Sequence, residues 1–376
     1  MISETMQWSS KTSATGGRAV EFSPDVSGRN CFAFLRLLLA FSIFFSHFGT
    51  LTGEKLFYWP ISGTMRVSGF FVISGFLIMR SYYRSANLLD YTKKRMRRIL
   101  PAYVLVIFIC AFSLIAVSSL SCREYFTSTA FYRYLAANLA FMNFIQPTLP
   151  GVFSGNLYPF VNGSLWTLKV EIMLYVFVPL LALFLKRRPV FVFVGLYILS
   201  FVFSLYMSYL HDTSGKHIYA LLQRQFLGQI RFFISGVILL FYFDFFKRQI
   251  KWILPTAAFF FLLRYFIQNT WINFVYPMSL GVVLIAFVYY FKKLAFISRY
   301  GDFSYGLFLF HFPVIQLFVH FGWLKEHPAL LFVVCFIIIL FLSYLSWHLL
   351  EKRMLKRNSR PSVTGTRNGC NPGSPV

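Results

Sequence analysis

The sequence predicts an all-α, polytopic membrane bundle of about ten transmembrane helices. Two observations on composition and pattern lead to this class: 57% of the residues are hydrophobic and only 13% are charged, and long apolar runs recur along the chain. A third observation is that lysine and arginine are concentrated in every second segment between these apolar runs. Soluble domains carry about 25% charged residues. This chain lacks the polar side chains to cover a water-exposed surface, so lipid must cover part of it.

The length of the apolar runs predicts where the spans lie. A helix needs roughly 20 apolar residues to cross the hydrocarbon core of a bilayer. The predicted spans lie near 30–50, 66–80, 99–120, 164–185, 189–210, 226–245, 250–268, 271–291, 303–323 and 329–350. The membrane domain is therefore expected at 30–352, between a polar tail at 1–29 and a second polar tail at 353–376.

The basic residues predict the orientation of these spans. Each predicted inside segment holds more lysine and arginine than both of its outside neighbours when the N-terminus is placed inside. This is the positive-inside pattern, so both termini are expected in the cytoplasm. The net charge of +24 would also suit a nucleic-acid-binding protein, but a basic stripe on one soluble face is missing. We expect a lipid bilayer as partner, and no nucleic acid.

The first predicted span carries two ionisable residues on one face. His47 follows Arg36 by eleven residues, which returns nearly to the same helix face after a rise of about 16 Å. Ionisable groups inside a bilayer are costly and suggest function. The alternative is that Arg36 reaches lipid headgroups and His47 sits in the outer interface.

A single carboxylate, Glu171, lies deep in a predicted span. A buried carboxylate must be paired or protonated. Lys169 is a poor partner, because residues two apart on a helix do not face each other. We expect a cation from another span, either Arg36 or protonated His47, and a purely structural ion pair is the alternative.

The last-but-one predicted span carries a histidine near its middle, on the same face as a serine. Ser304 and His311 are seven residues apart, and Pro313 should kink this helix and free a carbonyl. A simple interhelical hydrogen bond is the alternative role for His311. In the second span, the glycines of 69–77 allow close approach of another helix or an acyl chain.

Two segments outside the spans carry signals of their own. Five of the six residues at 93–98 are basic, more than orientation requires, and they would suit a cytoplasmic ligand with phosphates. An ordinary orientation signal is the alternative. The outer loop at 121–163 is long, which is typical of functional loops, and its aromatic stretch 130–147 suggests an interfacial helix. The cysteines form no C-x-x-C pair, so we predict no metal site.

Five motifs in this order resemble the acyltransferase 3 family of membrane-bound acyltransferases, which includes O-antigen, exopolysaccharide and Nod-factor acetylases. The resemblance covers roughly residues 30–352. The motifs are an Arg and a His separated by ten residues (Arg36, His47), Phe-Phe-x-x-Ser-Gly-Phe-Leu (Phe70–Leu77), Arg-x-x-Arg-Ile-x-Pro-x-Tyr (Arg95–Tyr103), Ser-Leu-Trp-x-Leu-x-x-Glu (Ser164–Glu171) and Ser-Tyr-Gly-x-x-x-x-His-x-Pro (Ser304–Pro313).

The resemblance implies an O-acyltransferase of the bacterial inner membrane. It implies cytoplasmic acyl-CoA, usually acetyl-CoA, as co-substrate and a carbohydrate hydroxyl as acceptor, with no bound cofactor. Predicted catalytic residues are His47, Arg36 and Glu171. Predicted acyl-CoA-binding residues are Arg95, Arg97, Arg98 and Ser74. Residues predicted to line the substrate site or pore are Asn162, Trp166, Ser304, Tyr305 and His311.

These residues suggest a mechanism. His47 takes a hydroxyl proton as general base or forms an acyl-histidine intermediate, and the sequence does not separate the two. Glu171 could orient His47, and Arg36 could stabilise an oxyanion or position the pantetheine arm. The rival class is a transporter or flippase of a glycan or lipid, which buried ionisable residues also suit. The absence of a visible internal repeat and the Arg36/His47 pair favour the enzyme.

Overall fold

The computed structural model describes residues 31–54, 63–267, 269–299 and 301–356. This part of the chain is helical and contains no strand beyond an isolated bridge between Ser118 and Val152. The predicted all-α class is therefore confirmed. The tail 1–29 lies outside the described residues, as does most of the tail 353–376.

The long helices lie at the predicted spans, although the third and the seventh begin earlier than predicted. They are α1 (Phe32–Thr52), α2 (Gly63–Tyr83), α3 (Leu88–Ser113), α6 (Trp166–Leu185), α7 (Pro189–Ser214), α9 (Phe226–Phe241), α10 (Phe243–Phe266), α11 (Thr270–Tyr290), α12 (Ser304–Phe321) and α13 (Pro328–Ser346). Shorter helices are α4 (Cys122–Thr127), α5 (Thr129–Leu139), α8 (His217–Gln223) and α14 (Lys352–Lys356), with 3-10 helices at Leu114–Val117 and Lys292–Arg299 and a π-helical turn at Trp347–Glu351.

Eight stretches within the described residues are long and apolar enough to cross a membrane. They cover eight of the ten predicted spans. The other two predicted spans fall on α2 and α10. These helices have 21 and 24 residues, which is long enough, but they are not apolar enough to be among the eight. The multi-pass membrane class is thus confirmed, whereas the count of ten and the sides of the termini stay predictions.

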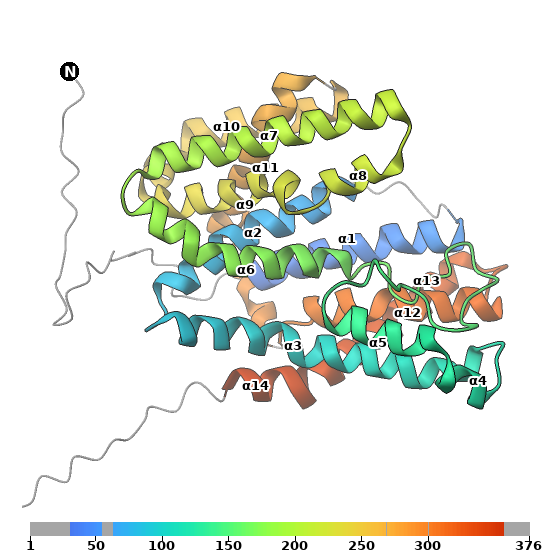
Figure 1. Cartoon of the computed structure of the whole chain (residues 1–376). Helices are drawn as coiled ribbons and strands as arrows, with labels where there is room; N and C mark the ends of the chain where they lie inside the picture. Colours follow the sequence, from blue (N-terminus) through green and yellow to red (C-terminus); the bar gives the residue numbers. More distant parts are fainter. Residues whose placement is uncertain (1–30, 55–62, 268, 300, 357–376) are drawn as a thin grey trace, which may run out of the picture.

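The helices surround α2 (Figure 1), which contacts α1, α9, α11 and α6. α12 lies between α1 and α13, and α3 runs along one edge of the bundle with α5 and α14 beside it. α7 and α10 lie at the opposite edge. This arrangement brings α1, α2, α3, α6 and α12 around one interior space.

Glycine sets the spacing between α2 and α9. A Cβ added at Gly75 would lie 1.9 Å from the carbonyl oxygen of Phe233, and one at Gly236 would lie 2.0 Å from that of Val72. The backbones of the two helices therefore touch, as small residues allow at helix interfaces. The close approach predicted for the second span is confirmed, with a helix as the neighbour.

The start of α3 corrects the predicted third span. The basic stretch 93–98 was expected in a loop before residue 99, but α3 begins at Leu88. Asn87 caps the helix by accepting a hydrogen bond from the backbone N–H of Asp90, and lysine and arginine are good helix formers. The basic side chains are therefore held on a helix.

In the outer loop, α5 covers the first part of the predicted helix at 130–147. The chain leaves the helix after Leu139, and Phe141 has a φ of 59°. Its ring stacks on Tyr103 of α3, with centroids 4.3 Å apart. The loop is thus packed against α3, and an interfacial position stays a prediction.

We expect Gly75→Ala and Gly236→Ala each to lower the thermal unfolding midpoint in detergent. The added methyl group meets a backbone carbonyl that no rotamer can move, and overpacking of this kind costs about 1–3 kcal/mol. Gly195→Ala is the matched control, because nothing lies within 4 Å of a Cβ there. Equal midpoints for all three variants would contradict the backbone contact between α2 and α9.

Candidate active site

A cavity of about 710 Å³ opens between α1, α2, α3, α6 and the start of α12. Small-molecule sites span about 300–1,000 Å³, so it can hold a ligand of substantial size. One part of its wall is apolar. The apolar side chains include Ile43, Val67, Phe70, Phe71, Ile73, Leu77, Ile78, Leu168 and Phe308.

The rest of the wall is strongly basic. Seven lysine and arginine side chains line the cavity against two carboxylates, Glu171 and Asp302. The seven are Arg36, Arg80, Arg84, Lys94, Arg95, Arg97 and Arg98. Most of them come from the end of α2 and the beginning of α3, so the basic charge gathers where these two helices meet.

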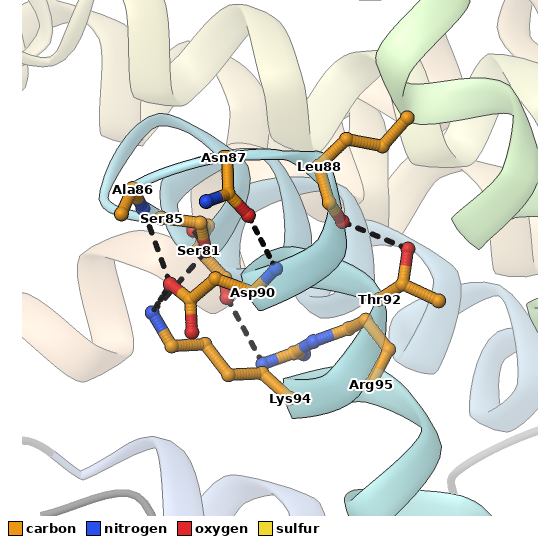
Figure 2. A network of polar contacts seen from close by, with 9 residues as sticks. All are labelled: Ser81, Ser85, Ala86, Asn87, Leu88, Asp90, Thr92, Lys94 and Arg95. Atoms are coloured by element: carbon orange, nitrogen blue, oxygen red, sulfur yellow. Dashed lines mark hydrogen bonds and ion pairs between the residues drawn. The ribbon is translucent and has the colours of Figure 1, made fainter.

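Polar contacts at the beginning of α3 hold part of this basic group in place (Figure 2). Asp90 pairs with Lys94 at 2.6 Å and also accepts a hydrogen bond from the backbone N–H of Ala86. Arg95 donates to the hydroxyl of Ser81 on α2 at 3.0 Å. The Nε atoms of Arg36, Arg80 and Arg95 are buried and have no hydrogen-bond partner among the described residues.

Asp302, in the cavity wall, connects α1, α3 and the start of α12. Its carboxylate accepts hydrogen bonds from Arg36 of α1 and, at 2.6 Å, from Arg98 of α3. The hydroxyl of Ser304 donates to the other oxygen. Burial raises the pKa of Asp302, but the two guanidiniums outweigh it and hold the pKa at about 2. Asp302 is therefore a carboxylate at any physiological pH.

Arg98 also reaches the C-terminal part of the membrane domain. Its Nη1 lies 3.7 Å from a carboxylate oxygen of Glu351, whose side chain is 2% exposed. Its guanidinium also lies 5.9 Å from the ring centroids of Tyr305 and Trp347. These contacts link α3 to α12 and to the end of α13.

Glu171 lines the same cavity as Arg36, but its contacts differ from those expected. Its carboxylate accepts a 2.7 Å hydrogen bond from the hydroxyl of Tyr175. No ion pair joins it to Arg36 among the described residues, and His47 has another partner. No hydrogen bond joins Glu171 to His47 among the described residues, and the roles suggested for Glu171 stay predictions.

His47 and His311 form a pair between α1 and α12. Nδ1 of His47 lies 2.7 Å from Nε2 of His311, and Nδ1 of His311 lies 3.1 Å from the carbonyl oxygen of Leu307. His311 is completely buried, whereas His47 is partly exposed. The pair lies beside the apolar part of the cavity, since the ring of Phe308 is 6.0 Å from that of His311 and Ile43 precedes His47 by one turn.

The outer loop is attached to α12 next to this pair. Pro313 has no N–H, so it leaves the carbonyl oxygen of Leu309 without its usual helical partner. Asn162 donates to this oxygen at 2.8 Å, and the hydroxyl of Ser164 donates to Asn162 at 2.6 Å. The freed carbonyl that the sequence predicted thus anchors the loop.

The predicted site residues divide into two groups. One group lines the cavity: Arg36, Ser74, Arg95, Arg97, Arg98, Glu171, Ser304 and Tyr305. The other group, which comprises His47, Asn162, Trp166 and His311, is not part of that lining. Trp166 is the first residue of α6 and packs against the core. The roles assigned to all of these residues stay predictions.

Two acidic residues with direct contacts to the predicted arginines were not singled out. Asp302 lies two residues before the motif that begins at Ser304, and this position just ahead of a helix with polar motif residues is the signal that could have found it. Glu351 directly follows the last predicted span, 329–350, although it is 1% exposed. Both residues lie just outside the predicted spans, so neither was identified as an intramembrane carboxylate.

Comparison with known proteins identifies the family. The family model described as an acyltransferase domain matches residues 29–348, nearly the whole membrane domain. The chain belongs to the acyltransferase 3 family. It is accordingly a membrane acyltransferase, as the resemblance of its motifs implied.

Individual members of this acyltransferase family match along most of the chain. A protein named O-acetyl transferase from Shigella phage Sf6 is 27% identical over 88% of this chain and 97% of its own length. Nodulation protein 10 of Rhizobium leguminosarum bv. viciae is 26% identical over 87% of this chain and 94% of its own.

A third relative is matched over about half of its own length. O-acetyltransferase OatA of Staphylococcus aureus is 25% identical over 80% of this chain, and the match covers 54% of OatA. No solved structure matches the chain.

We expect Asp302→Asn to destabilise this acyltransferase strongly. The substitution removes the counter-charge that the partly buried guanidiniums of Arg36 and Arg98 share. Breaking a fully buried ion pair costs about 3–5 kcal/mol, which is the upper bound for this loss. The measurement is the thermal unfolding midpoint in detergent. Asp244→Asn is the matched control, because Asp244 pairs with Lys247 on the surface with 72% of its side chain exposed. A midpoint for Asp302→Asn as high as that of the control would contradict the role of this carboxylate.

Proposed function

We propose that this chain is a membrane O-acetyltransferase that transfers an acetyl group from cytoplasmic acetyl-CoA to a hydroxyl of a cell-surface or lipid-linked glycan, in the inner membrane of a bacterium. The observation that carries the proposal is a cavity with a basic part and an apolar part, of which the apolar part lies beside a histidine pair. The names of relatives that match nearly end to end support the acetyl group and the oxygen acceptor.

The basic part of the cavity supports a donor that carries phosphates. A CoA thioester has a diphosphate and a 3′-phosphate at one end. The cavity offers seven cationic side chains, and three of its guanidiniums keep an unused Nε–H among the described residues. Hydrogen bonds between charged donors and phosphate oxygens are among the strongest in proteins. Arg80, Arg84 and Lys94 join the predicted Arg95, Arg97 and Arg98 in this role.

The apolar part of the cavity supports the other end of the same donor. The pantetheine arm of acetyl-CoA is uncharged and long, so it can follow a wall of aliphatic and aromatic side chains to a reactive group several turns away. Arg36 and His47 are separated by about 16 Å along α1. At this distance Arg36 is too far from His47 to stabilise an oxyanion there. We therefore propose that Arg36 positions the pantetheine arm.

His47 supplies the chemistry at the thioester. Imidazole is the side chain best suited to accept a proton near neutral pH. It takes the proton of the acceptor hydroxyl while the oxygen attacks the acetyl carbonyl. The C–S bond then breaks, and the imidazolium returns the proton to the departing CoA thiolate. The products are the acetyl ester and free CoA.

A glycan acceptor is proposed from the names of the relatives and from the outer loop. Tyr158 is 40% exposed and Phe160 is 38% exposed, on the loop that Asn162 fastens to α12. Aromatic faces of this kind are suited to pack on sugar rings. Their position on the loop attached to α12 supports an acceptor surface on the side of the bundle where α1 ends, near His47.

The direct experiment is incubation of the purified protein in lipid vesicles with radiolabelled acetyl-CoA and a candidate oligosaccharide. Label that becomes covalently attached to the sugar supports the proposal. Uptake of the sugar without covalent transfer would support a transporter and refute the enzyme. Mass spectrometry of surface glycans from a deletion strain identifies the acceptor and separates acetyl from succinyl or longer groups.

We expect His47→Ala to lose most of the transfer activity while the protein remains folded. General base catalysis contributes about 10²–10⁴-fold, so the rate should fall by at least the lower figure. His320→Ala is the matched control, since His320 lies on α12 and contacts the ring of Phe153 away from the pair. Wild-type activity in His47→Ala would refute the mechanism.

We expect the double variant Arg84→Ala/Arg95→Ala to bind acetyl-CoA more weakly. Hydrogen bonds to charged groups contribute about 1.5–3 kcal/mol each, so the Kd should rise at least tenfold in calorimetry, with a smaller effect at high salt. Arg187→Ala/Arg188→Ala is the control, because these basic residues lie outside the cavity wall. An unchanged Kd would show that the basic cluster serves only orientation in the membrane.

A further inference from the structure

The contacts of His311 define which nitrogen of His47 carries a hydrogen. We propose that His311 is a positioning residue that holds His47 in the tautomer with hydrogen on Nδ1, so that the lone pair of Nε2 is free to act on the substrate. This inference rests on the proposed function for its purpose. Its geometric part, the tautomer of His47, stands independently of that function.

The argument begins at a backbone carbonyl. The oxygen of Leu307 can only accept a hydrogen bond, so Nδ1 of His311, 3.1 Å away, must carry the hydrogen. In a neutral imidazole the other nitrogen is then an acceptor. Nε2 of His311 therefore accepts, and Nδ1 of His47, 2.7 Å away, must donate. Each step follows from valence once the carbonyl is in place.

The ring geometry supports a true hydrogen bond between the two imidazoles. Their planes differ by 8° and their centroids lie 5.0 Å apart. This separation is what the N···N distance and the radii of two five-membered rings together produce. The rings therefore meet edge to edge in one plane, and the donor N–H points at the acceptor lone pair.

Burial separates the roles of the two histidines. His311 is 0% exposed and both of its ring nitrogens are engaged, so it acts through His47 and does not touch a substrate. His47 is partly exposed, and its Nε2 has no hydrogen-bond partner among the described residues. The nitrogen without a partner, Nε2 of His47, therefore belongs to the histidine of the pair that is partly exposed.

Neighbouring groups fix the orientation of both rings. Phe312 meets the ring of His47 edge-on, at 5.5 Å and 77°. A Cβ at Gly163 would lie 2.8 Å from the ring of Phe312, so the backbone of the outer loop packs closely against this ring. Asn162 holds that loop to Leu309 on the same helix. The contacts around Pro313 on α12 thus support the orientation of both rings.

The tautomer has a direct chemical consequence. With hydrogen on Nδ1, Nε2 can receive the hydroxyl proton as the new C–O bond forms, and the imidazolium keeps its Nδ1–H bonded to neutral His311. The proton then leaves from Nε2 to the thiolate as the C–S bond breaks. Fixing the tautomer of a catalytic histidine is a known use of a neighbouring acceptor.

The first arm of the test is kinetic and uses three variants on α12. His311→Leu removes the acceptor, and we expect kcat to fall about 10²-fold with the KM for acetyl-CoA nearly unchanged. His311→Gln returns an oxygen acceptor at a similar reach, and we expect most of the loss to be recovered. His320→Leu, on the same helix, should behave as wild type.

The second arm does not require catalysis. Diethyl pyrocarbonate acylates neutral imidazole nitrogens, and mass spectrometry of peptides gives the rate at His47 alone. We expect modification of His47 to be about tenfold slower in His311→Leu and close to the wild-type rate in His311→Gln and His320→Leu. All variants are compared as monodisperse protein in detergent.

The outcomes separate the inference from the proposed function. An equal rate of His47 modification in wild type and His311→Leu would overturn the inference, whether or not the protein transfers acetyl groups. Full kcat in His311→Leu would also overturn it. Slower modification of His47 in a protein without any transferase activity would support the tautomer and refute the proposed function.

Discussion

The partly buried carboxylate of Asp302 makes the contacts on which the interior of this acyltransferase depends. It accepts hydrogen bonds from Arg36 of α1 and Arg98 of α3 while it precedes the first turn of α12. Charges in a low-dielectric interior are costly unless paired, so the three elements cannot separate without exposing two cations to an apolar environment. The cavity wall, and the contact of α12 with α1, follow from this junction.

The junction and the histidine pair lie on the same two helices. α1 carries Arg36 and His47, and α12 begins beside Asp302 and carries His311. A ligand that binds at the basic end therefore contacts the same rigid pair of helices that holds the imidazoles. The outer loop is coupled to this pair through Asn162, which occupies the carbonyl that Pro313 leaves free. The basic end of the cavity, the histidine pair and the outer loop are thus all attached to α1 and α12.

Local patterns in the sequence predicted those features of the bundle that depend on residues close together in the chain. The apolar runs, the glycine contact at Gly75 and the freed carbonyl before Pro313 depend on neighbouring residues in the chain. The extent of α3 was mispredicted, because lysine and arginine were interpreted as loop residues although they are good helix formers. Asp302 was not identified as the partner of Arg36, because 266 residues separate the two and no local pattern links them.

The sequence by itself determined the membrane class, the helical spans, the clustering of basic charge and the chemistry that histidine and arginine bring to α1. Hydropathy and composition act along the chain, so they can be interpreted without a fold. Only the tertiary structure decided which groups meet: Asp302 with Arg36 and Arg98, Tyr175 with Glu171, and His311 with His47. Hydrogen bonds and ion pairs act over a few ångströms, and the packing of distant helices alone sets which side chains come that close.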